Sequence, residues 1–229
     1  MTDTAKKLEE LEAAIAELKK APVLTQVVDT PATELLRLDF GCGKNKKEGF
    51  KGVDVRAWEG VDVVLNIAES HWPWHDNSVD EAHASHFIEH LTWPQRIHFF
   101  NELGRVMKKG AKATVIWPHW CSDRYYGDPT HQAPMSPFGL FYLNKDWRAG
   151  TKEWHESKGK AGMAPNAPHV DYDSNQDNHF WHEYTCDFDS TISYSLAPWM
   201  TGRNQEFIQF AMAAYKEAAQ DVMATLIRK

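Results

Sequence analysis

The chain has 229 residues, with 25 Lys and Arg against 32 Asp and Glu, and a formal net charge of −7. This acidic balance excludes the broad basic surface of a dedicated nucleic-acid-binding protein, and a hydrophobic share of 42% excludes wholesale disorder. No apolar run reaches the roughly 20 residues of a membrane-spanning helix, and the first thirty residues lack the apolar core of a secretory signal. The three cysteines form neither a disulfide framework nor a C-x-x-C metal pair. We therefore expect a cytoplasmic protein with no nucleic-acid or membrane partner.

The N-terminal segment has a narrow apolar stripe. Leu8, Leu11, Ile15 and Leu18 recur at helical spacing and predict a helix over residues 4–20. A proline-containing connector follows. We assign residues 1–30 to this helix and connector, and residues 31–229 to a single domain. The stripe favours docking of the helix on its own domain, and contact with a second copy in a homo-oligomer is the alternative.

Short apolar segments then alternate with polar ones, which predicts a buried parallel sheet. The expected strands cover residues 35–40, 52–55, 61–65, 79–85 and 111–117.

A helix is expected between the last two of these strands. Thr92 and Gln95 have the spacing of a capping box at its start, and Lys108, Lys109 and Gly110 predict its end.

The second half of the chain is less regular. Residues 118–182 lack periodicity and are rich in proline and histidine, so we expect a long irregular insertion that forms a lid over a site. Residues 184–196 predict an antiparallel hairpin that turns near Asp189, and apolar spacing predicts a helix over residues 207–226. The expected fold class is α/β: a Rossmann-like, mostly parallel sheet with a C-terminal antiparallel hairpin, an N-terminal helix and this insertion.

A glycine loop and an acidic residue indicate a cofactor site. Gly41, Cys42 and Gly43 follow the first strand, where glycines let the backbone approach a ligand closely. The dinucleotide pattern G-x-G-x-x-G fails because Lys46 takes the third glycine position. Asp54 ends the next strand, where a carboxylate can accept both hydroxyls of a ribose. The pair predicts a cofactor loop of another kind.

Four segments in this order carry a family resemblance: LRLDFGCG ending at Gly43, GVDV (52–55), WPWHDNSVDEAHASHFIEHL (72–91) and ELGRVMKKGAKATVIWP (102–118). Over about residues 35–118 the chain resembles class I S-adenosylmethionine-dependent methyltransferases of the type that acts on small molecules. The resemblance implies S-adenosyl-L-methionine as cofactor and a small-molecule substrate. The cofactor-binding residues that it implies are Asp39, Gly41, Cys42, Gly43, Asp54, Asn66, Ile67, Ser85 and His86.

The resemblance also implies particular roles. Asp39 would orient the loop and the methionine amine, and Asp54 would bind the ribose hydroxyls. Asn66 stands where relatives often have an Asp that contacts adenine. A second departure from the family's pattern is the connection between the first two strands, which is too short for a regular helix.

A rival interpretation comes from His86-x-x-Glu89-His90, which spells the inverted zinc-protease motif. On a helix, His86 and His90 would share a face and hold Zn²⁺, with Glu89 as general base. Relatives of the methyltransferase type commonly have a similar string here. Methyl transfer from a sulfonium requires no metal, so we expect none and keep a zinc-dependent hydrolase as the alternative.

The end of the fifth strand should open onto the site, beside the substrate that accepts the methyl group. His119, Asp128 and His131 follow it, and a transferase acting on O or N needs a group that takes a proton. We expect the catalytic residue among these three, and spacing does not select one. A cofactor-binding protein without transfer activity is a further alternative.

Overall fold

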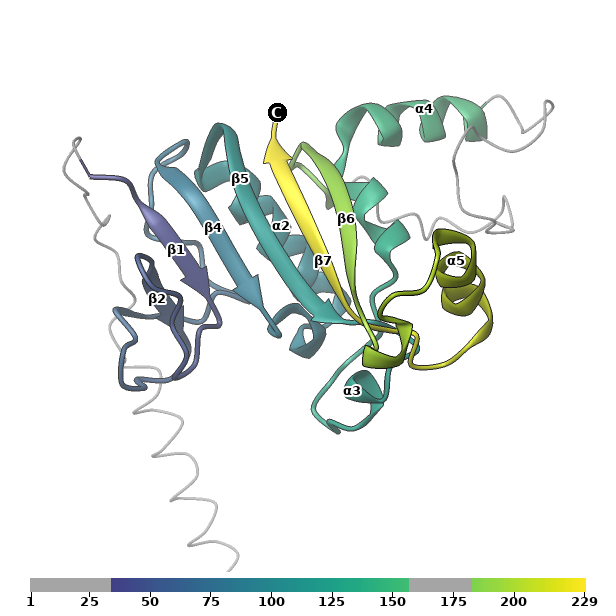
Figure 1. Cartoon of the computed structure of the whole chain (residues 1–229). Coiled ribbons are helices and arrows are strands. Elements are labelled where there is room, and N and C mark those ends of the chain that lie inside the picture. The colour runs from purple at the N-terminus through teal and green to yellow at the C-terminus, as the bar shows by residue number, and fades with distance from the viewer. Residues whose placement is uncertain (1–33, 157–182) are drawn as a thin grey trace, which may run out of the picture.

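The computed structural model describes residues 34–156 and 183–229, with the side chains of all of these except 151–156. Seven strands form one sheet in the order β3-β2-β1-β4-β5-β7-β6 (Figure 1). They are β1 (Arg37–Phe40), β2 (Lys51–Asp54), β3 (Val63–Val64), β4 (Val79–Ser85), β5 (Met107–Pro118), β6 (Phe188–Leu196) and β7 (Ala219–Arg228). Strands β1 to β5 pair in parallel, and β7 is antiparallel to both β5 and β6. The predicted fold class is confirmed.

Helices and short 3-10 turns connect the strands: η1 (Ile88–His90), α2 (Trp93–Val106), α3 (Asp123–Tyr126), η2 (Pro137–Leu143), α4 (Lys145–Glu156), η4 (Pro198–Met200) and α5 (Gln205–Ala214). Helix α2 begins with the predicted capping box, because Gln95 Oε1 accepts the backbone N–H of Thr92 at 3.0 Å. This bond satisfies one of the donors that a helix start leaves without a partner.

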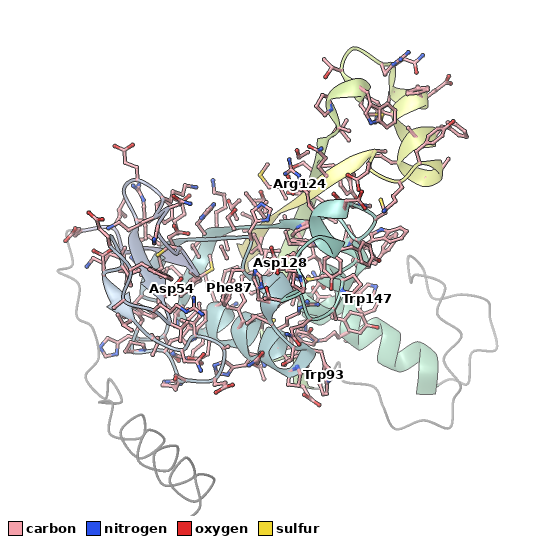
Figure 2. The ribbon with its side chains drawn as sticks, turned by 90° about the horizontal axis from the view of Figure 1, so that it is seen from below. Asp54, Phe87, Trp93, Arg124, Asp128 and Trp147 are labelled. Atoms are coloured by element: carbon pink, nitrogen blue, oxygen red, sulfur yellow. The ribbon has the colours of Figure 1, made fainter. Side chains whose placement is uncertain are left out.

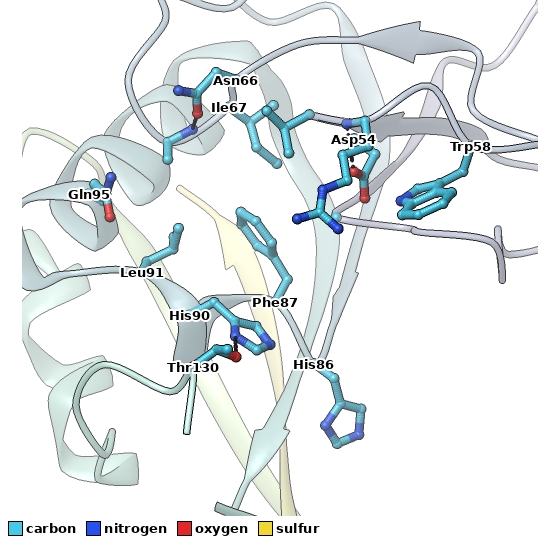
Figure 3. A pocket seen from close by; sticks show the side chains of 14 residues that line it. Asp54, Trp58, Asn66, Ile67, His86, Phe87, His90, Leu91, Gln95 and Thr130 are labelled. Carbon is cyan, nitrogen blue, oxygen red and sulfur yellow. Dashed lines mark hydrogen bonds between the residues drawn. The ribbon is translucent and has the colours of Figure 1, made fainter. Parts of the chain in front are cut away.

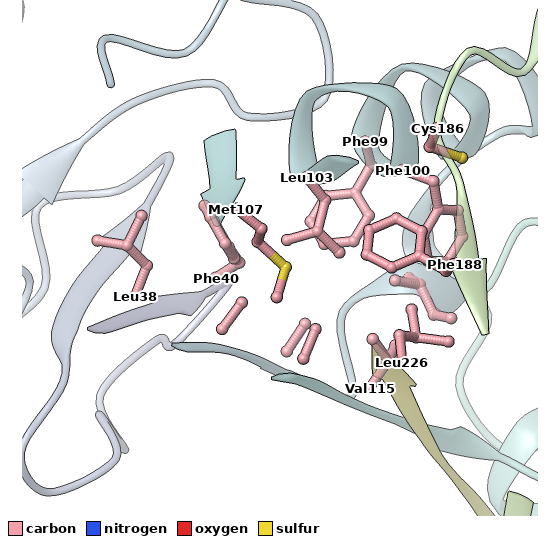
Figure 4. Close-up of a cluster of buried hydrophobic side chains, with 14 of the residues drawn as sticks. Leu38, Phe40, Phe99, Phe100, Leu103, Met107, Val115, Cys186, Phe188 and Leu226 are labelled. Atoms are coloured by element: carbon pink, nitrogen blue, oxygen red, sulfur yellow. The ribbon is translucent and has the colours of Figure 1, made fainter. Parts of the chain in front are cut away.

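Helix α2 covers one face of the sheet, and the main core lies between the two (Figure 4). Phe99, Phe100 and Leu103 on the helix are buried against strand residues such as Phe40 and Phe188. Each such side chain contributes about 1.5–3 kcal/mol by leaving water.

An aromatic cluster fixes the end of β1. Phe40 lies 4.4 Å from Trp72 and 5.7 Å from Phe99, measured between ring centroids. Because Phe40 directly precedes Gly41, this packing also fixes the position where the glycine loop begins.

The predicted hairpin over residues 184–196 and the predicted helix over 207–226 are wrong. Residues 188–196 form one continuous strand, and α5 ends at Ala214 before β7 begins. The C-terminal hairpin is made of β6 and β7. Val222 and Leu226 are four residues apart, an even number that suits one face of a strand as well as a helix, and buried Ala224 lies between them.

Two other boundaries differ from expectation. Helix α2 ends at Val106 rather than near Gly110, because Met107 is extended and pairs with Val79 in the sheet. The insertion 118–182 is not irregular throughout, since it contains α3, η2 and α4.

The predicted N-terminal helix and connector, and residues 157–182 of the insertion, lie outside the described residues. Within residues 34–156 and 183–229, no helix combines the length and apolarity needed to cross a bilayer.

Candidate functional site

A cleft of about 580 Å³ opens at the carboxyl ends of β1, β2 and β4 (Figure 3). In parallel sheets this edge is where ligands bind, and the volume is typical of small-molecule sites. The lining residues are Gly41, Asp54, Val55, Arg56, Trp58, Asn66, Ile67, Ala68, His86, Phe87, His90, Leu91, Gln95 and Thr130.

The glycine loop forms one wall of the cleft. Gly41 has φ +64° and donates its N–H to the carbonyl oxygen of Val53 at 2.8 Å. A Cβ at this position would lie 2.6 Å from Cγ of Phe87, so both the backbone and the space require glycine. Gly43 has φ +53° and does not line the cleft directly.

Asp54 is the acidic group of the cleft. Its Oδ2 accepts the N–H of Gly43 at 2.9 Å and its Oδ1 accepts the N–H of Arg56 at 2.9 Å. The side chain is therefore held rigidly between the glycine loop and the segment after β2. Each carboxylate oxygen has a further lone pair, so both can still accept a ligand hydroxyl.

Asp39 is buried behind the loop and does not line the cleft. Its Oδ2 accepts the N–H of Lys47 at 2.8 Å, and its Oδ1 lies 2.7 Å from His83 Nδ1. These bonds suit it to orient the loop. Cys42 and Ser85 are also outside the lining.

A further part of the cleft is lined by the segments after β2 and β3. Asn66 and Ile67 line it as predicted, and Asn66 Oδ1 accepts the N–H of Ala68 at 3.2 Å. Trp58 also lines it, with Lys44 Nζ 4.8 Å from the centroid of its ring. The sequence patterns did not single out Trp58, because a lone Trp in a polar segment has no diagnostic spacing.

His86 lies at the mouth of the cleft with an unusual backbone, φ +52°. Its Nδ1 is 3.4 Å from Glu89 Oε1, and its Nε2 is 4.0 Å from Asp221 Oδ1. Interaction with Glu89 raises the pKa of His86 above its usual value, against the opposing effect of burial.

The zinc-protease interpretation requires His86 and His90 on one face of a helix. The only helical turn here is η1, which begins at Ile88 and leaves His86 outside it. The described structure therefore lacks the arrangement that this alternative needs.

Two of the three predicted catalytic residues lie together beside the cleft, and the third lies apart. His131 Nε2 is 3.9 Å from Asp128 Oδ2, and Thr130 between them in sequence lines the cleft. His119 is buried, with its Nδ1 3.0 Å from Cys121 Sγ, and its desolvation lowers its pKa.

No protein-family model matches the sequence, and no curated protein matches it significantly. Solved structures do match. An S-adenosylmethionine-dependent methyltransferase from Archaeoglobus fulgidus has a TM-score of 0.53 at 19% identity, covering 85% of this chain and 86% of that one.

Two further matches have TM-scores below 0.5. A methyltransferase from Mesorhizobium loti is 10% identical with a TM-score of 0.41, covering 85% of this chain and 91% of its own. Geranyl diphosphate C-methyltransferase from Streptomyces coelicolor A3(2) is 17% identical with a TM-score of 0.38, covering 98% and 81%.

The strand order and the Archaeoglobus match together define the architecture. The chain has the fold of class I S-adenosylmethionine-dependent methyltransferases.

Proposed function

We propose that the cleft binds S-adenosyl-L-methionine and that the protein transfers its methyl group to an O or N atom of a small molecule. The observation that carries this is the position of Asp54. A rigidly held carboxylate at the end of β2 faces a cleft walled by Gly41, in the methyltransferase fold. Free lone pairs on both carboxylate oxygens suit the two hydroxyls of a ribose.

When bound, the cofactor would supply a methyl group activated by a sulfonium. The residues of this chain would then position the acceptor and exclude water. Phe87, Leu91 and Ile67 give the cleft an apolar wall suited to that exclusion. His131 and Asp128 are the candidates to take a proton from the acceptor, since both lie next to the cleft-lining Thr130.

The proposal is tested by calorimetry and by turnover. We expect S-adenosylhomocysteine to bind in the presence of a chelator, and NAD and ATP not to compete. A metabolite screen read by mass spectrometry should then reveal a product that has gained one methyl group. Binding without any methylated product would favour the non-catalytic alternative, and a lack of cofactor binding would overturn both.

The catalytic candidates are separated by comparing His131→Ala with His119→Ala. Both should keep cofactor affinity, because neither lines the cleft. We expect turnover to fall in His131→Ala, and loss of turnover in His119→Ala alone would reassign the proton acceptor to the buried site beside Cys121.

A further inference from the structure

Three potential metal ligands meet at one end of the cleft. Glu89 and His90 come from the turn η1, and His131 comes from the loop after α3. One ligand atom from each lies within 4.8 Å of the other two. His90 also lines the cleft (Figure 3), and Figure 2 labels Asp128 on the loop that carries His131.

The carboxylate of Glu89 is buried and accepts no hydrogen bond from the described residues. The residue is 1% exposed, and neither carboxylate oxygen has a hydrogen-bond partner among the described residues. Arg96 approaches this region but donates to the carbonyl oxygens of Ile88 and Ala133 instead. The ionic neighbour of Glu89 is His86, at 3.4 Å. Arg96 also interacts electrostatically with Glu89. A buried carboxylate that accepts no hydrogen bond still has lone pairs available for a directly bound cation.

Hydrogen bonds fix where each histidine carries its proton. The hydroxyl of Thr130 donates to Asp128 Oδ1 at 2.6 Å, so its oxygen accepts from His90 Nδ1 at 3.0 Å. His131 Nδ1 lies 2.6 Å from the carbonyl oxygen of Tyr125, which can only accept. Both rings therefore carry the proton on Nδ1 and a lone pair on Nε2. Such bonds to the outer ring nitrogen are the usual support of metal-binding histidines.

We propose that Glu89, His90 and His131 bind a divalent transition-metal ion of the Zn²⁺ class. Two histidines and one carboxylate leave coordination positions open for a further ligand. Bonds of about 2.0–2.1 Å require the three side chains to close on the ion, and His90 is exposed, so a shift of its ring meets little packing. Because His90 and Thr130 line the cleft, the open positions would take an oxygen of the acceptor, a role that rests on the proposed function. With His131 bound to the ion, Asp128 would be the residue that takes the proton.

The test uses the full chain, stripped with a chelator and dialysed. Titration with Co²⁺, followed by its visible absorption, should show one equivalent bound, and Zn²⁺ should displace it. His90→Ala and His131→Ala should each weaken binding at least about 100-fold, more than outer hydrogen-bond partners typically contribute. Thr130→Val removes only a positioning hydroxyl, and we expect a loss of about tenfold.

The matched control is His86→Ala. It removes the histidine that contacts Glu89 without being a proposed ligand, so Co²⁺ affinity should stay within about threefold or improve. Equal losses in His86→Ala and His131→Ala would overturn the proposal, as would a stripped wild-type chain that binds no Co²⁺ at about 1 mM. Thermal unfolding of each variant verifies that it is folded, and the exposed His90 provides the variant least prone to misfold.

The cofactor proposal and the metal proposal can each be rejected without rejecting the other. Binding of S-adenosylhomocysteine in chelator without Co²⁺ binding would reject the metal site alone. Co²⁺ binding without S-adenosylhomocysteine binding would reject the cofactor site and the acceptor role, while leaving the three ligands assigned.

Discussion

The side chain of Phe87 occupies the space that a Cβ on Gly41 would need. A Cβ built on Gly41 would fall 2.6 Å from Cγ and 2.8 Å from Cβ of Phe87, closer than side-chain atoms pack. The loop after β1 and the turn after β4 therefore meet without a gap, and both line the cleft.

Gly41→Ala should displace Phe87 and distort the cleft. We expect a lower melting temperature and a loss of S-adenosylhomocysteine affinity of at least tenfold, measured by thermal unfolding and calorimetry. Gly43→Ala is the matched control, since it also has positive φ but meets no atom within 4 Å. It should cost only the backbone strain of about 1–2 kcal/mol. Equal effects on affinity would show that the contact with Phe87 is unimportant.

Asp54→Ala should weaken S-adenosylhomocysteine binding by about 1.5–3 kcal/mol, the usual range for hydrogen bonds to a charged group. This corresponds to about 10- to 150-fold in Kd. Asp62→Ala is the control, because Asp62 likewise accepts a backbone N–H, that of Gly52 at 2.7 Å, but does not line the cleft. It should lower stability and leave affinity within about twofold. An unchanged Kd in Asp54→Ala would remove the ribose assignment.

Glu102 should make the fold sensitive to acid. Burial by itself would raise the pKa of Glu102, but hydrogen bonds from Arg105 and from the backbone of Trp72 outweigh it and lower the pKa below 4.5. As pH falls below about 4.5 the unfolded chain binds the proton first, so this contribution to stability is lost. Urea unfolding of wild type should therefore show a steeper decline in acid than that of Glu102→Gln. Parallel curves would contradict the assigned role.

The three thiols should differ in reactivity. Desolvation of the buried side chains raises the pKa of Cys42 to about 11 and that of Cys186 to about 12, so both stay protonated at neutral pH. Cys121 is partly exposed. We expect iodoacetamide to label Cys121 first, as read by mass spectrometry, with Cys121→Ser unlabelled until the protein is denatured. Early labelling of Cys42 would indicate an open glycine loop.

Local patterns predicted the parallel half of the fold well. The capping box of Thr92 and Gln95 and the pairing of a glycine loop with Asp54 depend on short stretches of sequence, and the structure contains both. The C-terminal elements differ from the prediction because the spacing of Val222 and Leu226 suits a strand as well as a helix. Pairing with β5, distant in sequence, decides in favour of the strand.

The grouping of Glu89 and His90 with His131 could not be predicted either, because it joins segments that are distant in sequence. The motif suggested His86 as the partner of His90, at a spacing that only a continuous helix would satisfy. The backbone at His86 has positive φ and breaks that helix, and the loop after α3 brings His131 in from a distant part of the sequence instead.

The strand order has a consequence for how the chain assembles. Among the described strands β6 pairs with β7 alone, yet β7 is made later and lies between β6 and β5. During synthesis, residues 188–196 and β5 therefore leave the ribosome before the strand that pairs with both of them. In the folded protein residues 219–228 cover both edges. Long-range pairing of this kind is slow and leaves strand edges available to other chains, so we expect the interval before β7 arrives to favour aggregation.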